Sequence, residues 1–270
     1  MAIIFNGKIF ASRRQEALKS QIKGLRSRGV NPKLATIMFS NDKTAAKYVD
    51  LKSKLAGKVG AELDIFEISS ARGADYILRV ITTLNRDPSV HGVMVQLPIP
   101  YRLKQSTKKI LNSILPKKDV DGLRDESPYM SATVKAITHI LDEAQVSKKD
   151  SILVVGSEGE VGKRVIKYLS LKGYAVDGVD KKHSYWNDYL KVKGPKAEVL
   201  ICATGKPGLI TADLVKPNAV IIDVGAPIGD VDFKTVSKIV RFITPVPGGV
   251  GPVTVVSLFE NLVEVASLNK

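Results

Sequence analysis

Short apolar runs of strand length alternate with helical segments along the chain, and this alternation most constrains its fold. The strand-like runs cover residues 34–39, 62–68, 92–97, 151–155, 175–179, 199–203 and 219–224. Apolar strands that are separated by helices are typical of a parallel sheet covered on both faces. The sequence therefore predicts an α/β protein.

The composition fits two modest domains. The chain has 270 residues, of which 44% are hydrophobic and 25% are charged, so it is long and apolar enough for folded cores. A turn-rich segment at 116–122 marks the end of the first sheet, and a helix over 133–143 carries the chain onward. The only cysteine, Cys202, excludes a disulfide framework, and the three histidines have no ligand spacing, so no metal site is expected.

No targeting or membrane segment is expected. No apolar run approaches the ~18–20 residues that a membrane span needs. The first residues also lack the basic and long apolar regions of a signal peptide. We therefore expect a cytoplasmic protein with no membrane partner.

Positive charge is concentrated in the first half of the chain. The net charge is +14, from 41 basic and 27 acidic residues. Residues 1–124 hold 23 basic and 10 acidic residues, a net of +13. Such a surface fits a nucleic-acid-binding protein or an enzyme with a polyanionic substrate. Aromatic residues make up only 6% and do not alternate with basic ones, so no base-stacking platform is indicated.

A glycine-rich turn follows the strand-like run at 151–155. Residues 156–162 have the spacing Gly-x-x-Gly-x-x-Gly and open a helix, where backbone N–H groups suit a diphosphate. The same spacing also fits a tight strand–helix turn that binds nothing. Asp180 ends the next strand, where an acid commonly holds a ribose 2′-hydroxyl, whereas Lys181 and Lys182 could hold a 2′-phosphate. These residues leave the choice between NAD and NADP open.

Three weaker features carry polar side chains that could do chemistry. Tyr48 and Lys52 share a helix face at i and i+4, where a phenol beside an ammonium favours proton transfer. Gln96 ends an apolar strand at the edge where ligands bind in open α/β sheets. Asp119 and Asp121 lie in a turn before a glycine. Each feature also has a structural interpretation: a surface pair, a residue bonded to a loop, and turn aspartates bonded to their own backbone.

Residues 244–252 are the most conformationally restricted segment, with three prolines and three glycines in nine residues. Glycines allow a ligand to approach the backbone closely. An X–Pro bond in this segment could be cis. The segment therefore indicates a functional loop rather than a plain linker.

Six motifs, taken together, resemble one family. In chain order they are Tyr48-Val-x-x-Lys52, HGVMVQLPIP at 91–100, KDVDG at 118–122, GKPG at 205–208, IDVG at 222–225 and PVPGGVGPVT at 245–254. Over essentially the whole chain, they resemble the bifunctional methylenetetrahydrofolate dehydrogenase/methenyltetrahydrofolate cyclohydrolase family.

The resemblance implies two α/β domains with a folate cleft between them. A folate-binding catalytic domain would comprise residues 1–124 with the C-terminal helix at 253–270, and a Rossmann-like NAD(P)-binding domain would comprise 125–252. The enzyme would oxidise 5,10-methylenetetrahydrofolate to 5,10-methenyltetrahydrofolate with NADP and hydrolyse this product to 10-formyltetrahydrofolate. The resemblance also implies a homodimer, a folate that can carry several glutamates, and no nucleic-acid partner.

Roles for individual residues follow from the same resemblance. Lys52 would handle protons in the hydrolytic step, and the catalytic set would be completed by Tyr48, Gln96 and Asp121. Folate would be bound by Tyr48, Gln96, Leu97, Pro98, Asp121, Pro247, Gly248 and Gly249. The nucleotide would be bound by Gly156, Ser157, Glu158, Lys181, Thr204, Ala226, Gly251 and Thr254.

The chain departs from the family pattern around the nucleotide. The segment between residues 122 and 133 is shorter than usual, residues 131–134 are Ser-Ala-Thr-Val in place of Pro-Cys-Thr-Pro, and Glu158 puts a carboxylate in the phosphate loop. We expect NADP rather than NAD because Lys181 and Lys182 are adjacent. The alternatives are a mainly cyclohydrolytic or NAD-preferring member of the same family and, more distantly, a nucleic-acid-binding protein that uses the basic first half.

Overall fold

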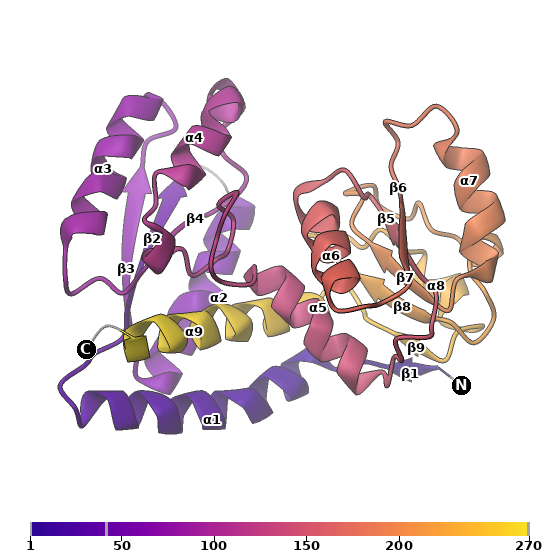
Figure 1. The fold of residues 1–270 in the computed structure, drawn as a ribbon, viewed down its shortest axis with the longest axis horizontal. Helices are drawn as coiled ribbons and strands as arrows, with labels where there is room; N and C mark the ends of the chain where they lie inside the picture. Colours follow the sequence, from indigo (N-terminus) through magenta and orange to yellow (C-terminus); the bar gives the residue numbers. More distant parts are fainter. Residues whose placement is uncertain (1, 41–42, 269–270) are drawn as a thin grey trace. The chain divides into compact units, whose positions relative to one another are not determined.

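The computed structural model describes residues 2–40 and 43–268, which form two compact units (Figure 1). The six-stranded unit contains residues up to Ala11 together with Thr133–Thr254. The three-stranded unit contains Ser12–Ala132 together with the residues from Val255 onward. The chain therefore passes between the units three times: twice inside a long helix and once after the first residue of the helix Ala132–Glu143. Residues 2–11 lie in the six-stranded unit, whereas the domains expected from the sequence group them with residues 12–124.

The three-stranded unit is built on a parallel sheet with the strand order β3-β2-β4. Its strands are β2 (Lys33–Phe39), β3 (Glu62–Ile68) and β4 (Gly92–Val95). Its helices are most of α1 (Gly7–Arg26), α2 (Lys43–Val59), α3 (Ala74–Arg86), α4 (Thr107–Asn112) and most of α9 (Val250–Leu268), with 3₁₀ turns η1 (Tyr101–Ser106) and η2 (Pro116–Lys118). Alternate β2 residues Ala35, Ile37 and Phe39 pack in one core with buried side chains of α3 and α4.

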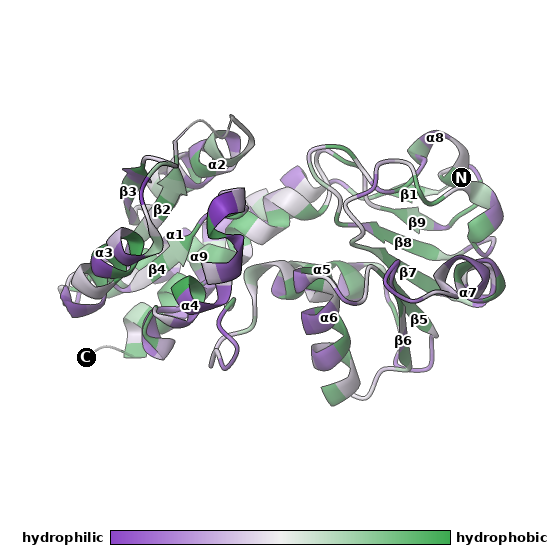
Figure 2. Cartoon of the chain, turned by 90° about the horizontal axis from the view of Figure 1, so that it is seen from above, coloured by the Kyte–Doolittle hydropathy of each residue, from purple (hydrophilic) through white to green (hydrophobic). Residues whose placement is uncertain are grey.

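The six-stranded unit is a parallel sheet with the strand order β1-β9-β8-β7-β5-β6. Its strands are β1 (Ile3–Ile4), β5 (Ile152–Val155), β6 (Val176–Val179), β7 (Val199–Cys202), β8 (Val220–Asp223) and β9 (Phe242–Ile243). Its helices are α5 (Ala132–Glu143), α6 (Glu160–Leu171), α7 (Trp186–Lys193) and α8 (Phe233–Val236), with 3₁₀ turns η3 (Gly194–Lys196) and η4 (Ala212–Leu214). The central strands β5, β7 and β8 are buried along their whole length and strongly hydrophobic (Figure 2).

The strand order creates a switch point in the six-stranded sheet. From β5 the chain passes through α6 to β6 on one side of β5, and it then returns through α7 to β7 on the other side. Ligands in open α/β sheets bind at such a point, outside the carboxyl ends of the strands. Gly156 follows β5 there with φ +89°, and a Cβ atom on it would lie 2.3 Å from the carbonyl oxygen of Ala203, which follows β7. Only glycine fits this turn.

Helix α9 corrects one expectation from the sequence. Within the described part of the chain, it is the one helix long and apolar enough to cross a membrane by length and composition. However, 67% of its most apolar window is buried inside the protein. Its Glu260 pairs with Arg14, and the amide of Asn261 donates to the carbonyl oxygens of Val120 and Met130. These contacts are those of a core helix.

Candidate active site and nucleotide pocket

Lys52 occupies a buried position on α2. The buried residues of this helix include Ala45, Val49, Ala56 and Val59, whose spacings of four, seven and three residues place them on one apolar face. Lys52 falls on the same face, where the helical period calls for an apolar side chain, and it is only 7% exposed. A lysine is almost never buried in this way without a partner.

Gln96 is that partner. The Nζ atom of Lys52 donates to the Oε1 atom of Gln96 at 2.6 Å. Gln96 follows β4, and its backbone N–H donates to the carbonyl oxygen of Ile37, which extends the sheet by one pairing. Its side-chain Nε2 donates to the carbonyl oxygen of Leu97 at 2.9 Å, just before the cis Leu97–Pro98 bond. This second hydrogen bond holds the amide so that its oxygen faces the ammonium.

Burial tunes the protonation of Lys52. Removal from water lowers the pKa of its ammonium from 10.5 to about 8, and the negative charge of Asp121 opposes this shift. At pH 7, roughly a tenth of such amines are neutral, compared with about one in 3,000 for an ordinary lysine. Tyr48 lies one turn earlier on α2 and is half-buried, and its burial raises the pKa of the phenol. The sequence-predicted residues Tyr48, Lys52, Gln96 and Asp121 all belong to the three-stranded unit.

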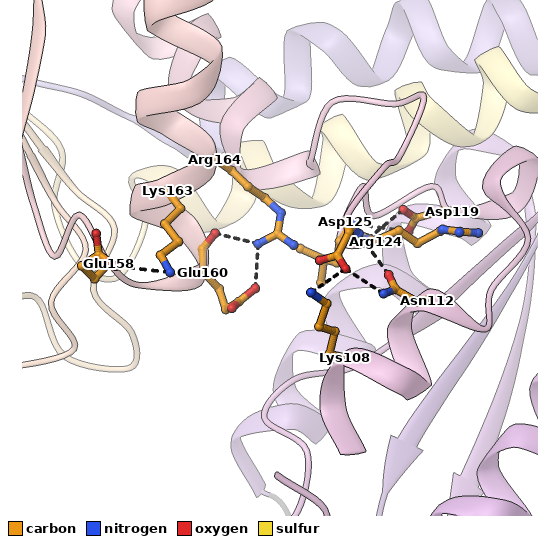
Figure 3. Close-up of polar contacts among 10 residues, drawn as sticks. Lys108, Asn112, Asp119, Arg124, Asp125, Glu158, Glu160, Lys163 and Arg164 are labelled. Atoms are coloured by element: carbon orange, nitrogen blue, oxygen red, sulfur yellow. Dashed lines mark hydrogen bonds and ion pairs between the residues drawn. The ribbon is translucent and has the colours of Figure 1, made fainter. Parts of the chain in front are cut away.

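The two turn aspartates have different roles. Asp119 is 1% exposed, and its carboxylate accepts hydrogen bonds from the backbone N–H groups of Leu123 and Arg124 (Figure 3). Asp119 therefore has the turn-stabilising role, and Asp121 is the carboxylate that acts on Lys52. Gly122 follows with φ +66°, and a Cβ atom on it would lie 2.6 Å from the backbone of Ser131.

The shortened segment after residue 122 is held by a separate polar cluster. The carboxylate of Asp125 pairs with Lys108 at 2.9 Å and accepts a hydrogen bond from Asn112 at 2.8 Å (Figure 3). The side-chain oxygen of Asn112 in turn accepts from the backbone N–H of Asp125. Helix α4 thereby anchors this segment within the three-stranded unit.

A pocket opens at the switch point of the six-stranded sheet, where the sequence predicts a diphosphate site. It is lined by Val155, Gly156, Glu158, Gly159, Asp180, Lys181, Lys182, Trp186, Ala203, Thr204, Lys206 and Leu209. It includes the Gly156 turn and the residue before the first turn of α6, as a nucleotide site requires. Three lysines supply positive charge, and the Lys206 ammonium lies 5.6 Å from the ring centroid of Trp186.

The carboxylates of the two acidic residues in this pocket are bonded to other groups of the protein. Asp180 is 7% exposed, and its carboxylate accepts from the backbone N–H groups of Glu158 at 3.1 Å and Lys182 at 3.0 Å. The carboxylate of Glu158 pairs with Lys163 on α6 at 3.3 Å, and Arg164 pairs with Glu160 on the same helix (Figure 3). The unfavourable Glu158 carboxylate in the phosphate loop is therefore partly neutralised by Lys163 of α6.

The other predicted nucleotide residues divide between the pocket and its surroundings. Gly156, Glu158, Lys181 and Thr204 line it. Ser157 is buried beside Gly178, while Ala226, Gly251 and Thr254 are outside the lining set. Trp186 and Lys206 line the pocket although the sequence analysis did not select them. Trp186 is the only tryptophan and opens an unpredicted helix, and Lys206 belongs to the GKPG motif, so both carried a detectable signal.

The proline- and glycine-rich loop belongs to the six-stranded unit. The Val246–Pro247 bond is cis, which confirms the possibility raised by the sequence. The carbonyl oxygen of Gly248 accepts from the N–H of Gly7 at 2.9 Å, and the N–H of Gly249 donates to the carbonyl oxygen of Pro245 at 2.8 Å. These bonds hold the predicted folate-binding residues Pro247, Gly248 and Gly249 in one conformation.

Comparisons with known proteins identify a family for each half of the chain. Residues 5–121 match the catalytic domain of the tetrahydrofolate dehydrogenase/cyclohydrolase family, and residues 131–270 match its NAD(P)-binding domain. The chain is 36% identical to the bifunctional protein FolD of Staphylococcus aureus (strain Newman), covering 97% of this chain and 95% of that protein.

Solved structures give the same result. The bifunctional FolD methylenetetrahydrofolate dehydrogenase/cyclohydrolase of Campylobacter jejuni superposes with a TM-score of 0.92 at 30% identity, with full coverage of both chains. The FolD enzyme of Trypanosoma brucei, solved with NADP and an inhibitor, has a TM-score of 0.90 at 28% identity, covering 99% of this chain and 98% of that one. The nucleic-acid alternative finds no support in these comparisons. This chain belongs to the tetrahydrofolate dehydrogenase/cyclohydrolase family.

Proposed function

We propose that this chain oxidises 5,10-methylenetetrahydrofolate with NADP and hydrolyses the methenyl product to 10-formyltetrahydrofolate, and that Lys52 moves the proton in the hydrolytic step. The observation that carries the role of Lys52 is its buried amine, with a pKa of about 8, 2.6 Å from the oxygen of Gln96. A group that exchanges protons at neutral pH needs a pKa near the working pH. A cytoplasmic location is part of the same proposal.

The hydrolytic step needs a proton acceptor and a proton donor in turn. A water oxygen bonds to the methenyl carbon as the neutral Lys52 amine takes one of its protons. The ammonium then returns this proton to the ring nitrogen as the carbon–nitrogen bond breaks and the new hydroxyl group becomes the formyl carbonyl. The hydroxyl proton leaves to water, so the lysine ends neutral and one proton is released, as the positive charge of the methenyl compound requires. Gln96 orients the amine through its hydrogen bond, and Asp121 stabilises the charged form through its carboxylate. Tyr48, on the same helix face, would pack against the folate.

The pocket of the six-stranded unit is proposed to take NADP in preference to NAD. When bound, this nucleotide accepts a hydride from the one-carbon unit of the folate. Lys181 and Lys182 are exposed on the pocket lining and would pair with a 2′-phosphate. Asp180, the usual partner of a ribose 2′-hydroxyl, has both carboxylate oxygens bonded to backbone N–H groups. This arrangement supports the preference for NADP.

The basic excess is proposed to favour folates with several glutamates. Residues 1–124 carry a net charge of +13, which attracts a polyanionic tail at long range. Such attraction weakens as salt screens the charges. The KM advantage of a pentaglutamate over a monoglutamate substrate should therefore shrink between 0.05 M and 0.5 M salt. A homodimer also remains part of the proposal, and sedimentation equilibrium would test it.

The central test separates the two activities. The wild type, Lys52→Met and the matched control Lys54→Met are assayed for NADP reduction with methylenetetrahydrofolate and for hydrolysis of the methenyl compound. Lys54 lies on the same helix but is exposed and pairs with Asp50. We expect Lys52→Met to lose hydrolysis while still binding folate, and Lys54→Met to behave as the wild type. Unimpaired hydrolysis by Lys52→Met would rule out the proposed role.

A further inference from the structure

Two buried aspartates lie among the loops that follow β7, β8 and β9, and neither is among the site residues assigned above. Asp223 is the last residue of β8 and is 3% exposed. Asp230 lies seven residues later and is fully buried. Buried carboxylates are costly unless their hydrogen bonds are well placed, so their partners indicate what they do.

Asp230 holds one wall of the nucleotide pocket. One carboxylate oxygen, Oδ2, accepts from the backbone N–H groups of Thr204 at 2.5 Å and Gly205 at 3.2 Å. The Thr204 hydroxyl oxygen then accepts from the backbone N–H of Lys206 at 3.0 Å. Thr204 and Lys206 both line the pocket, and Lys206 lies against Trp186. A single buried oxygen therefore fixes the path of the chain through this wall.

Asp223 holds Asp230 in turn. Its Oδ1 atom accepts from the backbone N–H groups of Gly225 at 2.9 Å and Asp230 at 3.0 Å, and its Oδ2 atom accepts from that of Val231 at 3.0 Å. The backbone N–H of Asp223 donates to the Thr244 hydroxyl at 2.7 Å, at the start of the proline- and glycine-rich loop. The two aspartates thus connect three loops at one edge of the sheet.

The second carboxylate oxygen of Asp230 allows the effect of its charge to be separated from the effect of its hydrogen bonds. Its Oδ1 atom is buried and has no hydrogen-bond partner among the residues that the structure describes. An asparagine could therefore keep its amide oxygen at the Oδ2 position and place its NH2 group at Oδ1. Asp230→Asn preserves both bonds to the wall, whereas Asp230→Ala removes them.

We propose that Asp230 is a positioning residue for the nucleotide: it sets the affinity of the pocket by holding the backbone N–H groups of Thr204 and Gly205, and Asp223 positions Asp230. The inference rests on the proposed function of the pocket as a nucleotide site. Because Asp230 already holds the pocket wall at Thr204 and Gly205 before the nucleotide binds, binding does not have to order this wall. Loss of the hydrogen bonds adds that ordering cost to the free energy of binding and weakens the affinity.

The test uses Trp186, the only tryptophan, as a fluorescent probe inside the pocket. NADP is titrated into the wild type, Asp230→Ala, Asp230→Asn and the control Asp232→Ala, whose carboxylate accepts a hydrogen bond from the Thr235 hydroxyl at 2.6 Å. We expect Kd to rise at least about tenfold in Asp230→Ala, from the loss of hydrogen bonds to a charged acceptor. Asp230→Asn and Asp232→Ala should stay within about twofold of the wild type.

Two further measurements exclude a general loss of structure. Hydrolysis of the methenyl compound depends on Lys52 and Gln96 in the other unit and should persist in every variant. Hydrogen exchange in a peptide spanning Thr204 and Gly205 should quicken in Asp230→Ala and stay slow in Asp230→Asn.

Two outcomes would overturn the proposal: NADP affinity unchanged in folded Asp230→Ala, or affinity lost in Asp230→Asn while its exchange stays slow. If Asp230→Ala does not fold, the Asp230→Asn variant decides: lost NADP affinity with slow exchange overturns the proposal, and retained affinity with slow exchange supports it. Failure of the wild type to bind NADP would instead reject the pocket assignment.

Discussion

Replacement of Lys52 by methionine should change how stability depends on pH, and the size of the change follows from burial. The pKa of Lys52 is about 8 in the folded protein and returns to about 10.5 when the chain unfolds. Between these values the unfolded chain binds one more proton than the folded one, so wild-type stability rises by about 1.4 kcal/mol per pH unit. The penalty for burying the ammonium is thus fully present below pH 8 and is relieved as the pH rises toward 10.5. Over the whole window it amounts to about 3 kcal/mol.

The assay compares the two proteins rather than their absolute stabilities. Urea unfolding of the wild type and Lys52→Met is followed by circular dichroism at intervals between pH 7 and pH 10.5. Methionine does not titrate, and the other ionisable groups cancel in the difference between the two free energies of unfolding. The wild type should gain about 3 kcal/mol relative to the variant across this range. A difference that stays flat would mean that the folded protein holds Lys52 with an ordinary pKa, and the proton-transfer argument would fail.

Three further predictions concern Gln96, Lys181 and Gly122. Gln96→Glu places a carboxylate against the ammonium and raises the pKa of Lys52, so hydrolysis at pH 7 should fall about tenfold and the pH–rate profile should move to higher pH. Lys181→Ala should raise the KM for NADP about tenfold and leave that for NAD unchanged; equal losses for both nucleotides would contradict a 2′-phosphate contact. Gly122→Ala should cost about 2 kcal/mol or more of stability in thermal unfolding, because of its φ of +66° and the backbone at 2.6 Å. The control Gly24→Ala, in α1 with nothing within 4 Å of its Cβ position, should stabilise by about 0.5–1 kcal/mol.

The parts of the fold that could be predicted from the sequence are those that a local pattern of residues determines. The runs at 34–39, 151–155 and 199–203 contain enough consecutive apolar residues to form buried strands wherever their neighbours lie, and the structure has strands there. β1 and β9 are only two residues long, and each is defined by its partner: Ile3 pairs with Phe242, more than 200 residues away. No local pattern reports such a pairing, so the domain boundaries expected from the sequence could not take it into account.

The buried position of Lys52 could be found from the sequence, but its pKa could not. The spacing of Ala45, Val49, Ala56 and Val59 already places residue 52 on the apolar face of its helix. The pKa depends on how completely that face is covered and on which aspartate of the turn acts on the lysine. The sequence does not distinguish Asp119 from Asp121, whereas in the structure the Asp119 carboxylate accepts hydrogen bonds from its own turn and the Asp121 carboxylate acts on Lys52.

The aspartates of the nucleotide pocket also differ in ways that the sequence does not show. A strand-end aspartate such as Asp180 suggests a ribose ligand because of its position, yet its carboxylate faces the backbone N–H groups of Glu158 and Lys182. Asp230 shows the converse, because no sequence pattern selected it and its hydrogen bonds lead directly to the pocket wall at Thr204. A carboxylate can serve a ligand or the backbone that forms the site, and its position in the sequence is compatible with both. In this pocket Asp180 accepts from backbone N–H groups and Glu158 pairs with Lys163, while Lys181, Lys182 and Lys206 line the space where an anionic ligand would lie, which is the arrangement that a phosphorylated nucleotide requires.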